Sequence, residues 1–139
     1  MQKRTILITA SDMSRLRRLL ESALHFFRHD RPYLEVLQNE LETARVVESK
    51  DIPEDVVTLN SRVCIRDLDT GKQVVSTVVF PKESYMNNEL LSVLAPVGTA
   101  VLGRRVGDIF ECTVPAGVRR LKLEGIETET RAQSVGKAA

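Results

Sequence analysis

Residues 94–108, Leu94-Ala-Pro-Val-Gly-Thr-Ala-Val-Leu-Gly-Arg-Arg-Val-Gly-Asp108, decide the fold of this chain. The apolar start of the stretch breaks at Gly98, and residues 99–102 have the length of one helical turn. Gly103 is placed to end that turn, as glycine does just after many short helices. Residues 106–108 form a second turn that leads into another apolar run. The stretch therefore predicts a short helix between two late strands.

Strand-like runs lie on both sides of this stretch. Many of them alternate apolar and polar residues, are rich in valine, and are bounded by turn signals such as Asp69-Thr-Gly71 and Pro115-Ala-Gly117. Periodicity alone predicts a mostly antiparallel α+β domain. The predicted strands cover residues 56–65, 73–80, 90–94, 109–114 and 121–126.

Two helical patterns come before these strands, after a short strand predicted at residues 5–9. Apolar residues recur at spacings of three and four from Met13 to Phe27, and Leu19, Leu24 and Phe26 widen the stripe. A second pattern with the same spacing follows Pro32. Two such helices joined by a short turn predict an antiparallel coiled-coil hairpin. The first helix is about 27 Å long at 1.5 Å per residue, so the hairpin needs support from the strand or the second domain.

The predicted organisation has four parts. Residues 1–48 form the short strand and the hairpin, and residues 49–55, which are polar and contain Pro53, form a linker. Residues 56–127 form the sheet domain, and residues 128–139 form a polar tail.

Composition excludes several classes of function. The chain has 139 residues and a net charge of +1, so no strong basic field favours direct DNA binding. The sequence has no apolar run long enough for a membrane span and no signal-peptide core, which predicts a cytoplasmic protein without a membrane partner. Cys64 and Cys112 are far apart and outside any metal-binding motif, so we expect free thiols.

The layout resembles the GreA/GreB family of transcript-cleavage factors, and most closely its short Rnk-type relatives. Two runs carry the resemblance: Asp55-Val-Val-Thr-x-Asn-Ser-Arg-Val63, and Ala95-Pro-Val-Gly-x-Ala-x-Leu-Gly-x-x-Val-Gly-Asp108. Gre factors have Ser-Pro where this chain has Ala95-Pro96. The resemblance implies a carboxy-terminal antiparallel sheet domain of Gre type, similar to FK506-binding proteins (FKBP-like). It also implies that this domain docks on bacterial RNA polymerase.

The resemblance implies two sets of site residues. The polymerase-docking residues are Ala95, Pro96, Val97 and Gly98, and the hairpin tip is Arg28, His29, Asp30, Arg31, Pro32 and Tyr33. In the cleavage factors the tip presents two carboxylates that help to hold Mg²⁺, because this cation prefers oxygen ligands. Here Asp30 is the only acid in the turn, and it lies between two arginines. We therefore expect a regulator that competes for the secondary channel of the polymerase without stimulating cleavage.

Three alternatives stay open at this point. The chain can be a cleavage factor to which Asp30 contributes a metal ligand, or a protein that acts directly on nucleoside diphosphate kinase, as the name of the Rnk-type relatives suggests. It can also be an interaction module for another partner.

The sequence shows no nucleophile–base pair, no phosphate-binding glycine loop and no convincing pair of catalytic acids. Few aromatic residues are available for a proline-binding cleft, which argues against prolyl isomerase activity. His25 and His29 share a helix face but lack a third metal ligand other than Asp30. We expect a non-enzyme without catalytic residues, cofactor or metal. We expect a monomer, although the apolar stripe of each helix could pack against a second chain as well as within the hairpin.

Overall fold

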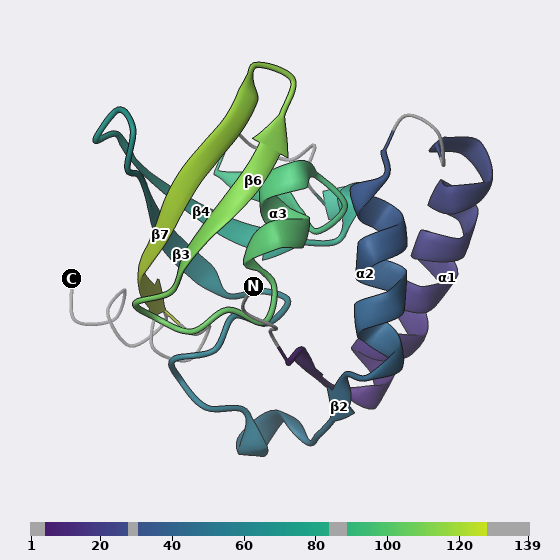
Figure 1. Cartoon of the computed structure of the whole chain (residues 1–139). Helices are drawn as coiled ribbons and strands as arrows, with labels where there is room; N and C mark the ends of the chain where they lie inside the picture. The colour runs from purple at the N-terminus through teal and green to yellow at the C-terminus, as the bar shows by residue number, and fades with distance from the viewer. Residues whose placement is uncertain (1–4, 28–30, 84–88, 128–139) are drawn as a thin grey trace.

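The computed structural model of the chain describes residues 5–27, 31–83 and 89–127. A helical hairpin stands beside a curled five-stranded sheet, and a short helix lies between the hairpin and the sheet (Figure 1). None of the helices in these three segments is long and apolar enough to cross a membrane.

The predicted hairpin is confirmed as helices α1 (Ala10–Phe27) and α2 (Tyr33–Glu42). Thr9 Oγ1 accepts a hydrogen bond of 3.3 Å from the Asp12 N–H and so caps the start of α1. Phe26 does not widen the apolar stripe as predicted, because 74% of its surface is exposed. The buried residues of the two helices recur at helical spacing: Met13, Leu16, Leu20, Leu24, Leu34, Leu37 and Leu41.

Two short strands close the base of the hairpin. Strand β1 (Leu7–Ile8) pairs in parallel with β2 (Arg45–Val46), directly after α2. The Arg45 N–H donates a 2.9 Å hydrogen bond to the Ile6 carbonyl. Strand β2 was not predicted from the sequence. It is followed by a single 3-10 turn, η1 (Ser49–Asp51), inside the predicted linker.

The sheet has the strand order β5-β4-β3-β7-β6. Strand β5 runs parallel to β4, and the other neighbouring pairs are antiparallel. The predicted antiparallel sheet is therefore a mixed one, because β5 pairs in parallel with β4. Strand β4 is followed by the 3-10 turn η2 (Pro81–Glu83). The strands are β3 (Arg62–Asp67), β4 (Gln73–Val79), β5 (Leu90–Ser92), β6 (Ile109–Val114) and β7 (Gly117–Glu127).

The strand predicted from Val56 is wrong over its first half. Val57 and Leu59 are buried, but they lie in a loop. The Val57 N–H donates to the Arg104 carbonyl at 2.9 Å, and the Gly103 N–H donates to the Val57 carbonyl at 3.0 Å. Asn60 then takes a left-handed conformation, with φ of 73°, which interrupts an extended chain. The two hydrogen bonds of Val57 accompany an isolated antiparallel bridge between Val56 and Arg105, which does not extend into a strand. The alternation therefore reports the burial of a loop that pairs with another segment only at this bridge.

One continuous apolar core joins the hairpin to the sheet, from Ile6 to Ile126. The Arg15 guanidinium of α1 lies 3.8 Å from the centre of the Phe80 ring and 3.9 Å from a Glu83 carboxylate oxygen. A cation over an aromatic face is attracted to it. The hairpin thus rests on the sheet domain, as its short length predicted.

Candidate functional site

The four predicted docking residues form the start of a helix. Helix α3 spans Pro96–Val101, and Ala95 is its extended N-cap residue. The predicted helix began at Thr99, so the observed one starts three residues earlier. Proline suits the first helical position because it needs no N–H partner there and its φ is already fixed near the helical value. Pro96 therefore begins a helix and does not end a strand.

Gly98 brings α3 against β5. It is buried, and a Cβ atom at this position would lie 2.0 Å from the Ser92 carbonyl oxygen and 2.9 Å from its carbon. Only a residue without a side chain allows this approach of two backbones. Gly98 thus supports the predicted docking surface from within, while Ala95, Pro96 and Val97 are partly exposed.

The end of α3 is also fixed by a glycine. Gly103 has a φ of +82°, and a Cβ atom there would lie 3.0 Å from the Ile6 side chain. The left-handed conformation ends the helix at little cost only for glycine. The prediction that Gly103 stops the short helix is confirmed.

A buried hydroxyl group holds α3 to the chain that follows β5. Thr99 is 3% exposed, and its Oγ1 donates a 2.7 Å hydrogen bond to the Val93 carbonyl. This bond fixes the rotation of α3, and with it the direction in which Pro96 faces.

Replacing Thr99 with valine should lower the free energy of unfolding by about 1–2 kcal/mol, because the Val93 carbonyl then loses its hydroxyl donor. Urea denaturation measures the change. The matched control is Thr113→Val at an exposed position of β6, where the effect should stay within about 0.5 kcal/mol. Equal stability of the two variants would contradict the role assigned to this hydrogen bond.

A groove of about 510 Å³ lies beside the start of α3. Helix α3 stands between α2 and β6 in Figure 1, and these three elements supply the groove walls. Val36 on α2 is 56% exposed and Ile109 on β6 is 48% exposed, so the groove presents apolar surface to solvent. We call it the α2–α3–β6 groove; its lining includes Tyr33, Val36, Glu40, Pro96, Ala100, Arg104, Ile109 and Phe110.

Tyr33 connects the predicted hairpin tip to the predicted docking residues. It packs against the core and lines the same groove as Pro96. Burial raises the pKa of the Tyr33 phenol, and the neighbouring Arg31 charge opposes part of this effect. The phenol is therefore neutral at physiological pH. Of the other tip residues, Arg31 is partly exposed and Pro32 is exposed, whereas Arg28, His29 and Asp30 lie outside the described residues.

A buried thiol lies in this groove. Cys112 is buried on β6, and burial raises its thiol pKa. A raised pKa keeps the thiolate, which is the reactive form, scarce at neutral pH. Cys64 is half-buried and also free, so the prediction of two free thiols is confirmed.

The described segments contain no group of three His, Cys, Asp or Glu residues that could hold a metal ion. His25 is exposed, and its ring meets the Phe26 ring edge-on, with centroids 5.1 Å apart. A pairing of Asp30 or His29 with other ligands stays untested, since both residues are outside the described segments.

Two exposed groove residues were not identified from the sequence. Val36 lies among polar residues on the outward side of α2, and Ile109 follows the turn at Asp108. An apolar residue at an outward helical position is the only signal the sequence offers for Val36. Nothing in the sequence shows that Val36 and Ile109 face the same groove, because this depends on how α2 packs against the sheet.

Both parts of the chain match known protein families. The family description "Transcription elongation factor, GreA/GreB, C-term" matches residues 52–128, and "Rnk N-terminus" matches residues 4–47. A regulator of nucleoside diphosphate kinase from Escherichia coli K12 is 39% identical over 136 residues, which cover 98% of this chain and 97% of that protein.

Gre proteins give further matches. A transcription elongation factor GreA from Clostridium beijerinckii is 38% identical over 90 residues, which cover 65% of this chain and 56% of that protein. The match thus spans little more than half of the GreA chain. A solved structure described as a GreA/GreB elongation factor from Nitrosomonas europaea is 37% identical with a TM-score of 0.72, covering 89% of this chain and 98% of the other.

Proposed function

Because the chain belongs to the GreA/GreB family and carries an Rnk-type amino terminus, we propose that it regulates transcription by binding bacterial RNA polymerase. It docks at the secondary channel and competes there with Gre-type factors without stimulating transcript cleavage. The names of its relatives, a regulator and elongation factors, support a role in transcription. A transcription regulator can change the cellular level of nucleoside diphosphate kinase without touching the kinase, which accounts for the name of the Escherichia coli relative.

The exposed apolar surface of the α2–α3–β6 groove is the observation that carries the docking proposal. Val36, Pro96 and Ile109 all line this groove, and each leaves apolar surface in contact with solvent. Contiguous apolar surface of this kind, with charged residues at its edge, is typical of protein interaction sites. Here Glu40, Arg104 and Glu111 supply the charges.

The length of the hairpin supports competition without cleavage. Helix α1 has 18 residues and α2 has 10, or about 27 Å and 15 Å at 1.5 Å per residue. A tip that acts at the catalytic centre needs a longer hairpin than one that occupies the channel entrance. The packing of α1 and α2 against the sheet domain further shortens the part that can project.

The test is a competition experiment on backtracked elongation complexes that a Gre factor is cleaving. Increasing amounts of this protein should suppress RNA cleavage, and the protein alone should leave cleavage at its intrinsic rate. Absence of suppression at large excess would show that the polymerase surface is not its target. Cleavage by the protein alone would favour the alternative in which Asp30 assists a metal.

A further inference from the structure

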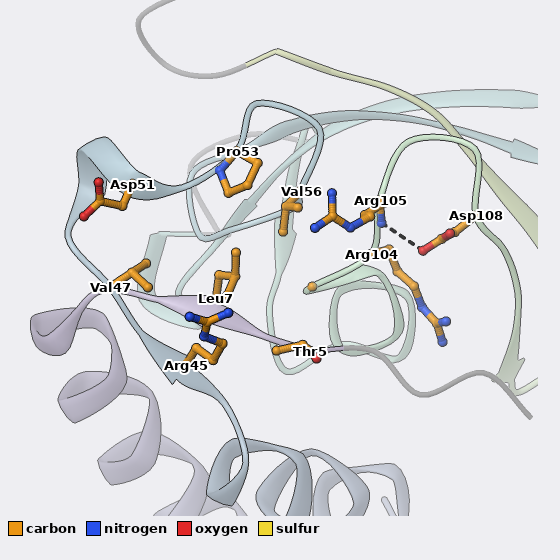
Figure 2. Close-up of a pocket in the computed structure, with 11 residues that line it drawn as sticks. Thr5, Leu7, Arg45, Val47, Asp51, Pro53, Val56, Arg104, Arg105 and Asp108 are labelled. Atoms are coloured by element: carbon orange, nitrogen blue, oxygen red, sulfur yellow. Dashed lines mark hydrogen bonds between the residues drawn. The ribbon is translucent and has the colours of Figure 1, made fainter.

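A second cavity, of about 880 Å³, lies at the base of the hairpin and belongs to neither predicted site. Its walls come from β1, β2, the segment after η1 and the turn that follows α3 (Figure 2). The volume is within the range of about 300–1000 Å³ that small-molecule sites occupy. The cavity joins the amino-terminal part of the chain to the sheet domain.

One wall of this cavity is apolar. Leu7, Val47 and Pro53 line it and are half-buried, and Val56, which is buried, lines it as well. Accessible apolar side chains inside a concave site suit a flat, weakly polar group such as a nucleobase.

Two guanidinium groups approach the cavity from different parts of the chain. Figure 2 shows Arg45 of β2 on one side and Arg105, from the turn after α3, on another. The Arg45 side chain is exposed and has no polar side-chain partner within the described segments. The β1–β2 ladder fixes its backbone.

Arg105 is positioned by hydrogen bonds, but these bonds do not use all of the N–H groups of its guanidinium. Its backbone N–H donates to Asp108 Oδ2 at 2.9 Å, which positions the turn. Its Nη1 donates to Asp55 Oδ2 at 3.1 Å and Oδ1 at 3.3 Å. Both side-chain bonds use Nη1, which leaves Nη2 and Nε as donors for a ligand.

The other charged residues that line the cavity are Arg104, Asp51 and Asp108, and their side chains do not occupy the space between Arg45 and Arg105. Arg104 points away from the cavity in Figure 2; its Nε donates to the Ala100 carbonyl at 3.1 Å, and its guanidinium lies 4.9 Å from the Phe110 ring centre. Asp51 lies at the far margin with its carboxylate directed outward. The Asp108 carboxylate accepts the hydrogen bond from the Arg105 backbone N–H.

We propose that this cavity binds a nucleoside diphosphate or triphosphate. The phosphates lie between Arg45 and Arg105, because guanidinium groups form paired, charge-assisted hydrogen bonds with phosphate oxygens. The base lies against the apolar wall. Since Arg45 belongs to the hairpin base and Arg105 to the sheet domain, the ligand also bridges the two parts and stabilises their packing.

Isothermal titration calorimetry on the full chain tests this proposal without polymerase, with ADP, GDP, inorganic pyrophosphate and adenosine as probes. At least one of the two nucleotides should bind, and more tightly than pyrophosphate or adenosine. Arg45→Gln and Arg105→Gln should each weaken that binding about tenfold or more, as expected for the loss of a charged hydrogen bond. The control Arg120→Gln removes the same charge from an exposed position on β7 and should leave binding unchanged.

Asp55→Asn gives a result that misfolding cannot imitate. It removes the carboxylate that holds Arg105 Nη1, so nucleotide affinity should rise. Circular dichroism confirms that every variant is folded. No binding of ADP or GDP at millimolar concentration, unchanged affinity in both arginine variants, or pyrophosphate binding as tight as the nucleotides would each overturn the proposal.

Discussion

Replacing Gly98 with alanine is expected to destabilise the protein by about 3 kcal/mol or more, the upper end for overpacked positions. The new Cβ would lie 2.0 Å from the Ser92 carbonyl oxygen and 3.2 Å from the Val93 Cα. These are backbone atoms, which cannot rotate away as a side chain can. Helix α3 must therefore move off β5, and this movement strains the hydrogen bond from Thr99 to the Val93 carbonyl.

Thermal and urea unfolding measure this effect, with a fall in Tm of about 10 °C or more expected for a chain of this size. Gly125→Ala is the matched control, because a Cβ on Gly125 of β7 meets no atom within 4 Å and its φ is not in the left-handed region. That variant should stay within about 0.5 kcal/mol of the parent. If Gly98→Ala were equally stable, the close contact between α3 and β5 would be wrong.

The helical hairpin could be predicted from the sequence because each helix buries one side only. Burial on one side leaves an apolar spacing of three and four, and the buried residues from Met13 to Leu41 follow it. The prediction failed where exposure does not follow the pattern. Phe26 is apolar yet 74% exposed, so an apolar residue within the helical pattern is not always part of the buried face.

Strand pairing was harder to predict, since alternation reports which residues are buried and not what the backbone bonds to. Val57 and Leu59 alternate like strand residues but lie in a loop that contacts the turn after α3. The parallel pairing of β5 with β4, and of β2 with β1, depends on contacts between distant parts of the chain. Short strands of two or three residues leave too little periodicity to detect.

The sequence located the candidate docking segment but not its surroundings. The motif at Ala95–Gly98 was found, whereas its start as a helix, the burial of Gly98 and the facing residues Val36 and Ile109 emerge only from packing. A motif describes one stretch of chain. A groove needs three elements to come together, and their relative positions are set by side chains throughout the core.

Placing an aspartate at Pro96 is expected to reduce affinity for RNA polymerase about 30-fold or more. Docking would bury an unpaired carboxylate in the apolar α2–α3–β6 groove, and the loss matches the 2 kcal/mol or more that marks a central interface residue. The fold should survive, because Pro96 is partly exposed at the first position of α3. A negative charge is favourable there, and the added N–H needs no partner within the helix.

Two further variants decide whether such a loss reports the groove or only an added charge. Ile109→Asp changes the β6 wall of the groove, 48% exposed, and should weaken binding in the same way. Val118→Asp adds the same charge at a 58% exposed valine of β7 that does not line the groove, and it should bind normally.

Fluorescence anisotropy with labelled protein measures the affinities of the three variants for RNA polymerase. Loss in the first two variants with normal binding of the third places the docking surface at the groove. Equal loss in all three would assign the effect to charge alone, and undiminished binding of Pro96→Asp would remove Ala95–Gly98 from the interface.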